Sequence, residues 1–288
     1  MSGAEQAPLI GVAQFAPALG RTGDNRERAR EAIIEAAQRG CVMVVLPECC
    51  ISGFQFDTRG ALLEAAEEID GPSVREFCGL ARAYHITVVG GIAEREGGSI
   101  YNTAVLAAPN GDLARYRKCH LFGREKAFFS EGGQLVCYQS PWGIIGLAIC
   151  YDLWFPEMTR ALALAGASLI AVPANWFIPP RQASDEPPSL LAMGVHIAMA
   201  AACSNEVVIA CADRIGEENG VRFLGQSCIV APNGRPLAGP ASAEDDALLV
   251  APWPDVAGPR DHPEPSGIAA RPALPSERRA DPMTGIAG

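Results

Sequence analysis

Short apolar runs rich in β-branched residues recur along the chain, and longer segments of mixed polar and apolar residues separate them. Such runs are typical of β-strands that helices cover on at least one face. The pattern therefore predicts strands at residues 9–15, 42–46, 86–93, 103–107, 143–149, 168–172 and 207–212.

The segments between these runs predict helices. In residues 24–39, Ala29 and Ile33 lie on one helical stripe, Asp24 is a candidate N-cap, and Gly40 is a candidate stop signal. This pattern is typical of a surface helix with one buried face. We expect the other helices at residues 74–84, 156–165 and 189–203.

Two stretches share one local plan. Residues 105–116, VLAAPNGDLARY, and residues 228–239, CIVAPNGRPLAG, each predict a strand, a Pro-Asn-Gly turn and a second strand. The reason is that Asn-Gly readily supplies the positive φ of a tight hairpin. Strands, helices and hairpins are thus mixed, which favours an α+β layered sandwich over a purely parallel fold.

The last part of the chain differs from the rest. From Pro254 onward, prolines and charged residues become frequent and the apolar periodicity ends. We expect one domain over residues 1–253 and an extended Pro-rich tail over residues 254–288, either loose or laid on a partner subunit.

Composition limits the classes of partner. The chain has 288 residues and a net charge of −10, which argues against nucleic-acid or anionic-membrane partners because these favour a basic surface. Its 10 cysteines include no C-x-x-C pair, which fits reduced thiols in the cytoplasm. The sequence shows neither an export signal nor an apolar stretch of about 20 residues that would span a membrane.

Residues 143–167, GIIGLAICYDLWFPEMTRALALAGA, contain the clearest chemical signal. Cys150 lies where an apolar strand ends, and Pro156 suits the first turn of a following helix. A cysteine at such a junction is presented at a sheet edge, where a helix N-terminus favours the thiolate. The alternative is that Cys150 is one more small buried hydrophobic residue.

A cysteine nucleophile needs a base, and Glu48 is a better candidate than any histidine of the chain. It follows the apolar run VMVVLP, so burial would raise its pKa towards a useful value. Strand alternation places Lys118 opposite Arg117, facing inward, where it would stabilise negative charge on a reacting oxygen. The alternatives are a solvent-exposed loop acid and an exposed lysine at the end of a hairpin.

Four motifs resemble the nitrilase, or carbon-nitrogen hydrolase, superfamily. They are LPECCISGF around Glu48, YRKCHLFG around Lys118, EKAFFSEGG from Glu125, and AICYDLWFPEMTRALALAGASLIAVPAN around Cys150. The resemblance extends over roughly residues 8–250. It implies the four-layer α-β-β-α sandwich of that family, with neither a metal nor an organic cofactor.

The resemblance also implies the chemistry of the site. Cys150 would attack an amide carbonyl to give a thioester, and Glu48 would take the thiol proton and later protonate the departing ammonia. Lys118 and the backbone N–H of Tyr151 would hold the oxyanion.

Two glutamates and an aspartate have open roles. Glu125 matches a second glutamate of many family members and would orient the substrate or tune the pKa of the catalytic base. The alternative is a solvent ion pair with Arg124 or Lys126. Asp152 and Glu131 are candidates for binding a substrate amine.

Several aromatic residues fall near predicted strand ends and suggest an apolar or aromatic-lined cleft, with core packing as the alternative. They are Phe54, Trp154, Trp176 and Phe177.

The residues after the nucleophile, Cys150-Tyr151-Asp152 and Phe155-Pro156-Glu157, resemble the amidase and omega-amidase branches. We therefore expect hydrolysis of a small carboxamide to a carboxylic acid and ammonia. The alternatives are an N-carbamoyl amide hydrolase, a thiol-based binding or redox protein without turnover, and acyl transfer to an amine.

The chain departs from the family pattern late in the sequence. Many members carry Ala-Asn-Arg-x-Gly where this chain has an aspartate, Asp213, between Ala212 and Arg214. This departure leaves the core chemistry in place and bears on the substrate geometry. The resemblance further implies a homodimer or a higher homo-oligomer.

Overall fold

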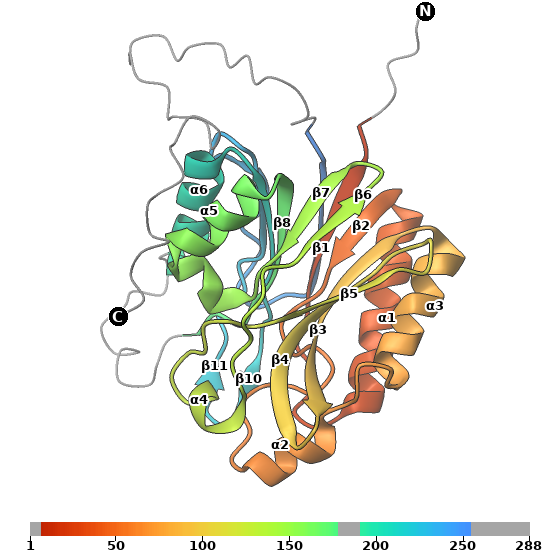
Figure 1. The fold of residues 1–288 in the computed structure, drawn as a ribbon, viewed down its shortest axis with the longest axis vertical. Helices are drawn as coiled ribbons and strands as arrows, with labels where there is room; N and C mark the ends of the chain where they lie inside the picture. Colours follow the sequence, from red (N-terminus) through yellow and green to blue (C-terminus); the bar gives the residue numbers. More distant parts are fainter. Residues whose placement is uncertain (1–6, 178–190, 255–288) are drawn as a thin grey trace, which may run out of the picture.

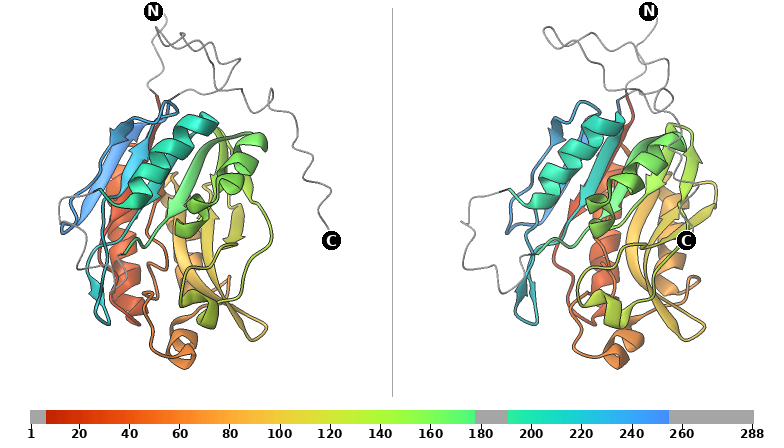
Figure 2. Two further views of the ribbon diagram at one scale, coloured as in Figure 1. Left: turned by 90° about the vertical axis from the view of Figure 1, so that its left-hand side faces the viewer. Right: turned by 60° about the vertical axis from the view of Figure 1, so that its left-hand side comes forward.

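The structure is a computed structural model that describes residues 7–177 and 191–254. Two six-stranded sheets are stacked face to face, with helices on both outer sides (Figures 1 and 2). The expected α+β sandwich of four layers is therefore confirmed. From residue 255 on, the expected Pro-rich tail lies outside the described residues.

The first sheet is mixed. Its β1, β2 and β3 run parallel, and the other neighbours pair antiparallel. In spatial order its strands are β14 (Ala247–Pro252), β1 (Leu9–Gln14), β2 (Cys41–Val45), β3 (Thr87–Glu96), β4 (Ser99–Ala107) and β5 (Leu113–Arg117).

The second sheet has the same plan, with β7, β8 and β9 parallel. In spatial order its strands are β13 (Pro236–Ala238), β12 (Cys228–Val230), β9 (Val208–Ala212), β8 (Ala167–Pro173), β7 (Gly143–Leu147) and β6 (Cys137–Ser140). A separate short pair is formed by β10 (Glu217–Glu218) and β11 (Val221–Arg222).

Apolar side chains from the two inner faces form the main core. Val12, Val45 and Leu106 of the first sheet and Ile170 and Ile209 of the second are fully buried there. Burying each such side chain contributes about 1.5–3 kcal/mol to folding. The apolar runs of the sequence are strands because both sides of these sheets are covered.

The outer layers are pairs of helices. Figure 1 shows α1 and α3 on one side of the sandwich and α5 and α6 on the other. Ile33 of α1 and Phe77 of α3 pack into the same apolar cluster as Val44 and Val88 of the first sheet. The helices are α1 (Thr22–Gln38), α2 (Arg59–Ala65), α3 (Pro72–Tyr84), α4 (Glu125–Phe128), the 3-10 helix η1 (Cys150–Trp154), α5 (Pro156–Leu164) and α6 (Met193–Asn205).

The expected ends of α1 were half right. Asp24 is not the N-cap, because the helix begins at Thr22 and Asp24 lies in its first turn, paired with Arg21 at 2.8 Å. Gly40 does end the helix as expected, with φ +79 and its N–H on the carbonyl of Ala37 at 2.9 Å.

Other boundaries moved by a few residues. The strand expected at residues 143–149 ends at Leu147, because the N–H of Ile149 binds Asp152 Oδ2 at 2.9 Å instead of continuing the ladder. The helix expected at residues 189–203 is α6, which begins at Met193, and residues 189–190 lie outside the described residues. Strands β6 and β14 and helix α2 were not predicted, since their segments are short and of mixed polarity.

Both expected hairpins are confirmed, as β4–β5 and β12–β13. In the two turns, Asn110 Oδ1 and Asn233 Oδ1 each accept the N–H two residues on, at 3.0 Å. The following glycines, Gly111 and Gly234, have φ +95 and +79.

The parallel strands determine where a site can form. Because the carboxyl ends of parallel strands meet at one edge of a sheet, the segments after β2, β7, β8 and β9 come together at one end of the sandwich. Among the described helices, none is long and apolar enough to cross a membrane. All ten cysteines lie in the described ranges and are free.

Candidate active site

Glu48 follows β2 and is 1% exposed. Its Oε1 accepts hydrogen bonds from Lys118 Nζ at 2.7 Å and from Asn102 Nδ2 at 2.6 Å, while its Oε2 has no partner. Burial raises the pKa of Glu48, and the Lys118 charge offsets only part of this rise. Glu48 is therefore a buried carboxyl group with one oxygen free to exchange a proton.

The turn that carries Glu48 presses against β3. A Cβ built on Gly91 would lie 2.4 Å from the backbone N of Cys49 and 2.7 Å from Glu48 Cα. Only glycine leaves room for this approach. A glycine of β3 thus helps to place the carboxylate.

Lys118 follows β5 and is 1% exposed. Its Nζ donates to Glu48 Oε1 at 2.7 Å and to Glu125 Oε2 at 2.8 Å. Burial alone would lower the pKa of Lys118, but the two carboxylates outweigh burial and raise it well above its usual value. The ammonium is therefore held charged between two acids, and the alternative of an exposed lysine is wrong.

Glu125 opens α4 and is 4% exposed. Its Oε2 accepts hydrogen bonds from the N–H of Phe122 at 2.6 Å and from Lys118 Nζ at 2.8 Å. The alternative, a solvent ion pair with Arg124 or Lys126, is wrong.

Asn102 of β4 joins the two glutamates and was not predicted from the sequence. Its Nδ2 donates to Glu48 Oε1 at 2.6 Å and to Glu125 Oε1 at 2.8 Å, and the residue is fully buried. The available signal was a single amide in the otherwise apolar end of the strand YNTAVLA. A buried amide needs partners, so such a position indicates a polar network.

Cys150 opens η1 with φ 45 and is 8% exposed. Burial, followed by the charge of Glu48, raises the pKa of its thiol well above the usual value. The Lys118 charge and a hydrogen bond from the backbone N–H of Asn175 act in the opposite direction. The charges of Glu48, Lys118 and Glu125 thus all act on the Cys150 thiol, and the rise in its pKa favours the protonated form.

Asp152 fixes the turn after Cys150. Its carboxylate accepts the hydroxyl of Tyr116 at 2.7 Å and the N–H groups of Ile149 and His120 at 2.9 and 3.0 Å. Both oxygens are therefore occupied, which makes the expected amine-binding role of Asp152 wrong. Glu131 is exposed, and its amine-binding role stays a prediction.

Several buried polar atoms near Cys150 lack a partner. Both side-chain polar atoms of Asn175, Trp176 Nε1 and Asp213 Oδ2 form no hydrogen bond. Asp213 Oδ1 accepts the N–H of Trp176 at 2.8 Å, which fixes the segment after β8 against that after β9. These unpaired polar atoms lie on the segments that follow β8 and β9, and the unpaired Oε2 of Glu48 belongs to the same end of the sandwich.

Of the aromatic residues expected at the cleft, Trp176 is buried in the core, whereas the others are partly exposed. Trp176 is 4% exposed, and a Cβ on Gly194 would lie 2.2 Å from its ring, so its indole packs directly on α6. Tyr151, Trp154 and Phe54 are partly buried and lie in ring contacts with other aromatic residues.

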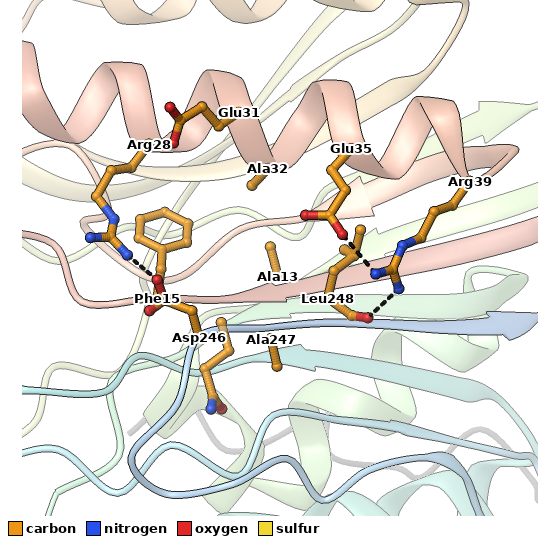
Figure 3. A pocket seen from close by; sticks show the side chains of 11 residues that line it. Ala13, Phe15, Arg28, Glu31, Ala32, Glu35, Arg39, Asp246, Ala247 and Leu248 are labelled. Atoms are coloured by element: carbon orange, nitrogen blue, oxygen red, sulfur yellow. Dashed lines mark hydrogen bonds and ion pairs between the residues drawn. The ribbon is translucent and has the colours of Figure 1, made fainter.

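A separate pocket of about 380 Å³ lies on the outside of the first sheet, between α1 and β14 (Figure 3). Four of its charged groups are paired with one another, Arg28 with Asp246 and Arg39 with Glu35 at 2.7 Å. None of the four proposed catalytic residues lines it, so it is not the candidate active site. The described residues also contain no group of three or more His, Cys, Asp or Glu placed to hold a metal ion.

Comparison with known proteins gives consistent matches. The family model described as carbon-nitrogen hydrolase matches residues 9–254. A nitrilase of Pyrococcus abyssi is 37% identical over 242 residues, covering 82% of this chain and 86% of the relative. An (R)-stereoselective amidase of Pseudomonas sp is 33% identical, covering 79% of each chain.

An omega-amidase of Danio rerio is 32% identical, covering 77% of this chain and 80% of the relative. Among solved structures, a mutant amidase from Nesterenkonia sp. AN1 in complex with butyramide has a TM-score of 0.71 and 27% identity, covering 87% of this chain and 91% of that one. A double mutant of the same amidase in complex with acrylamide has a TM-score of 0.72 and 26% identity, covering 88% and 94%.

Proposed function

Because this chain belongs to the carbon-nitrogen hydrolase family, we propose that it hydrolyses a small carboxamide to a carboxylic acid and ammonia through a thioester on Cys150. Amide-hydrolysing relatives and an amidase of the same fold with an active-site cysteine support this proposal. The observation that carries it is the buried Lys118 ammonium, bonded to Glu48 and Glu125 at 2.7 and 2.8 Å beside Cys150.

In the first half of the reaction, the Cys150 thiol transfers its proton to Glu48 as the sulfur attacks the amide carbonyl. Because the pKa of the buried thiol is raised, a neighbouring base is needed at this step. The free Oε2 of Glu48 suits that task. Lys118 and the N–H of Tyr151 stabilise the oxyanion, and each such donor typically contributes about 3 kcal/mol.

The tetrahedral intermediate then collapses. The C–N bond breaks, Glu48 returns the proton to the leaving nitrogen, and ammonia departs from the thioester. In the second half, water attacks the thioester while Glu48 takes its proton, and the C–S bond breaks. Glu48 finally reprotonates the Cys150 sulfur, so the enzyme regains its starting state.

Glu125 acts on this chemistry through Lys118. Its carboxylate holds the ammonium on the side opposite Glu48, so the cation stays charged and fixed. Because Glu48 and Glu125 share one lysine, two negative charges face one positive charge. This favours a protonated Glu48 after it has taken the thiol proton.

The direct test is ammonia release from simple amides by Cys150→Ala. We expect turnover to fall below detection while the melting temperature stays near that of the wild type. Cys203→Ala is the matched control, since Cys203 is exposed on α6 and should be silent. Wild-type turnover by Cys150→Ala would show that the nucleophile is another residue.

The acyl-enzyme is tested by mass spectrometry. Quenching the reaction with a reactive amide should add the acyl mass to Cys150, and an adduct on another thiol would contradict the assignment. Carbon dioxide release from ureido compounds, without turnover of simple amides, would instead indicate an N-carbamoyl amide hydrolase.

A further inference from the structure

Five aromatic side chains from separate segments pack against one another beside the proposed catalytic residues. This aromatic collar consists of Phe54, Phe122, Tyr151, Phe177 and Phe223. Ring centroids lie 4.9 Å apart for Phe122 and Tyr151, 5.6 Å for Phe122 and Phe177, and 6.0 Å for Phe177 and Phe223. The rings are tilted or edge-to-face, which are the arrangements that aromatic pairs favour.

The collar is attached to the site through the backbone. Tyr151 follows Cys150 directly, and the N–H of Phe122 donates to Glu125 Oε2 at 2.6 Å. Phe177 comes two residues after Asn175, whose backbone N–H lowers the pKa of the Cys150 thiol. Tyr151, Phe122 and Phe177 therefore belong to segments that adjoin Cys150 and its charged neighbours.

A buried ion pair holds the other side of the collar. Glu218 Oε2 accepts the N–H of Phe54 at 3.0 Å, and Glu218 pairs with Arg214. The Arg214 guanidinium lies 4.0 Å from the ring centroid of Phe223. A bridge between Phe177 and Phe223 closes this side. The rings are thus held in place before a ligand binds, which reduces the entropy cost of binding.

The collar still offers apolar surface to a ligand. Phe223 is buried, but Phe54, Phe122, Tyr151 and Phe177 are only partly buried. Partly exposed rings on segments that adjoin a candidate nucleophile are typical of a pocket wall.

The charges of the site disfavour an anionic substrate. Among the described residues, the buried cations of this region are Lys118 and Arg214, and both are already paired with carboxylates. A substrate carboxylate would have to shed its hydration shell and would be repelled by Glu48 and Glu125. Neither of these buried cations is free to form an ion pair with it.

From these contacts we propose that the site selects neutral amides whose acyl group is aromatic or otherwise apolar. Amides whose acyl chain carries a carboxylate are rejected. The inference rests on the proposed amide hydrolysis at Cys150, and it adds the class of substrate.

The test compares kcat/KM for ammonia release from 3-phenylpropionamide, butyramide and the monoamide of succinic acid. Butyramide and the monoamide of succinic acid have acyl chains of the same length, which end in a methyl group and in a carboxylate. We expect the phenyl amide to exceed butyramide by about tenfold or more, and the anionic amide to fall about tenfold or more below butyramide. The inference is overturned if the anionic amide, or an ammonium-bearing one such as 4-aminobutyramide, is hydrolysed best.

Variants of the collar give a second readout. Phe177→Ala should lower kcat/KM for the phenyl amide about tenfold more than for butyramide, and Phe177→Leu should restore part of that difference because it restores apolar volume. Tyr84→Ala is the control, since Tyr84 is 42% exposed on α3, outside the collar. An unchanged ratio between the two substrates in Phe177→Ala would overturn the role of the collar.

These outcomes separate the two levels of the argument. If the wild type releases ammonia from no amide, the proposed function itself fails. If it hydrolyses butyramide and the anionic amide equally well, amide hydrolysis stands and only the selection by the collar is overturned.

Discussion

Asp213 carries a fully buried carboxyl group whose Oδ2 has no hydrogen-bond partner. Its neighbour Arg214 is paired with Glu218, so no cation is dedicated to it. Burial raises the pKa of Asp213 well above its usual value, and nearby Glu48 adds to the rise. Burial therefore favours the neutral form of this side chain, which is close in shape and polarity to the asparagine that many family members carry at this position.

This predicts a pH-dependent effect of Asp213→Asn. Because the folded pKa is raised, the contribution of Asp213 to stability is complete below its unfolded pKa of about 3.9 and is lost as pH rises through the folded pKa. The loss is about 1.4 kcal/mol for each pH unit between these values. Asn cannot ionise, so the variant should gain stability relative to wild type as pH rises.

Urea unfolding at pH 4 and at pH 8 measures this difference. Asp70→Asn, at an exposed position, is the matched control and should show little change with pH. Equal destabilisation by Asp213→Asn at both pH values would show that the native carboxyl is ionised.

Asn102 supports a second prediction at the residue scale. Asn102→Ala removes the hydrogen-bond donor that Glu48 and Glu125 share. The two carboxylates then lose the amide that lies between their Oε1 atoms, so they repel each other more strongly. We expect a loss of about 1–3 kcal/mol of stability and a fall in kcat of about tenfold or more. Kinetics and urea unfolding on one preparation measure both, and an unchanged kcat would limit Asn102 to a structural role.

At the scale of elements, the contact between β3 and the turn after β2 is the tightest constraint on the base. Gly91→Ala would place a methyl group 2.4 Å from the backbone N of Cys49, and backbone atoms cannot move aside cheaply. We expect a loss of about 1–3 kcal/mol of stability together with reduced kcat, because Glu48 shifts with the turn.

The matched control for this prediction is Gly79→Ala. Gly79 lies in α3 with nothing within 4 Å of an added Cβ. Alanine should stabilise that helix by about 0.5–1 kcal/mol. Thermal melts and kcat for both variants test the argument, and similar effects at the two positions would contradict it.

At the scale of the whole molecule, the outer helices of the second sheet leave apolar side chains in contact with solvent. Leu164 of α5 is 50% exposed and Met193 of α6 is 62% exposed. Such surface is typical of an interface, and the family resemblance implies a homodimer or a higher homo-oligomer.

We therefore expect the 30.3 kDa chain to sediment as a dimer. Leu164→Glu should shift it towards the monomer, whereas the exposed Leu113→Glu on β5 should not. A wild type that stays monomeric at micromolar concentration would contradict this prediction.

The sequence by itself determined the main elements and their kinds, because periodicity and turn residues are local properties. The strand runs, the two Asn-Gly hairpins and Gly40 at the end of α1 are such features. It also predicted Glu48, Lys118, Glu125 and Cys150 as candidate site residues, because each lies in a short motif with a recognisable context.

Only the tertiary structure decided how these residues meet. Lys118 lies 70 residues from Glu48, and Asn102 lies 54 residues from it, so their hydrogen bonds depend on the register of β2, β3 and β4. Asp152 became a structural anchor for the same reason, since its partner Tyr116 comes from the opposite sheet. Sheet pairing and layer stacking are non-local, and a local pattern of residue types does not encode which buried polar atoms will face one another.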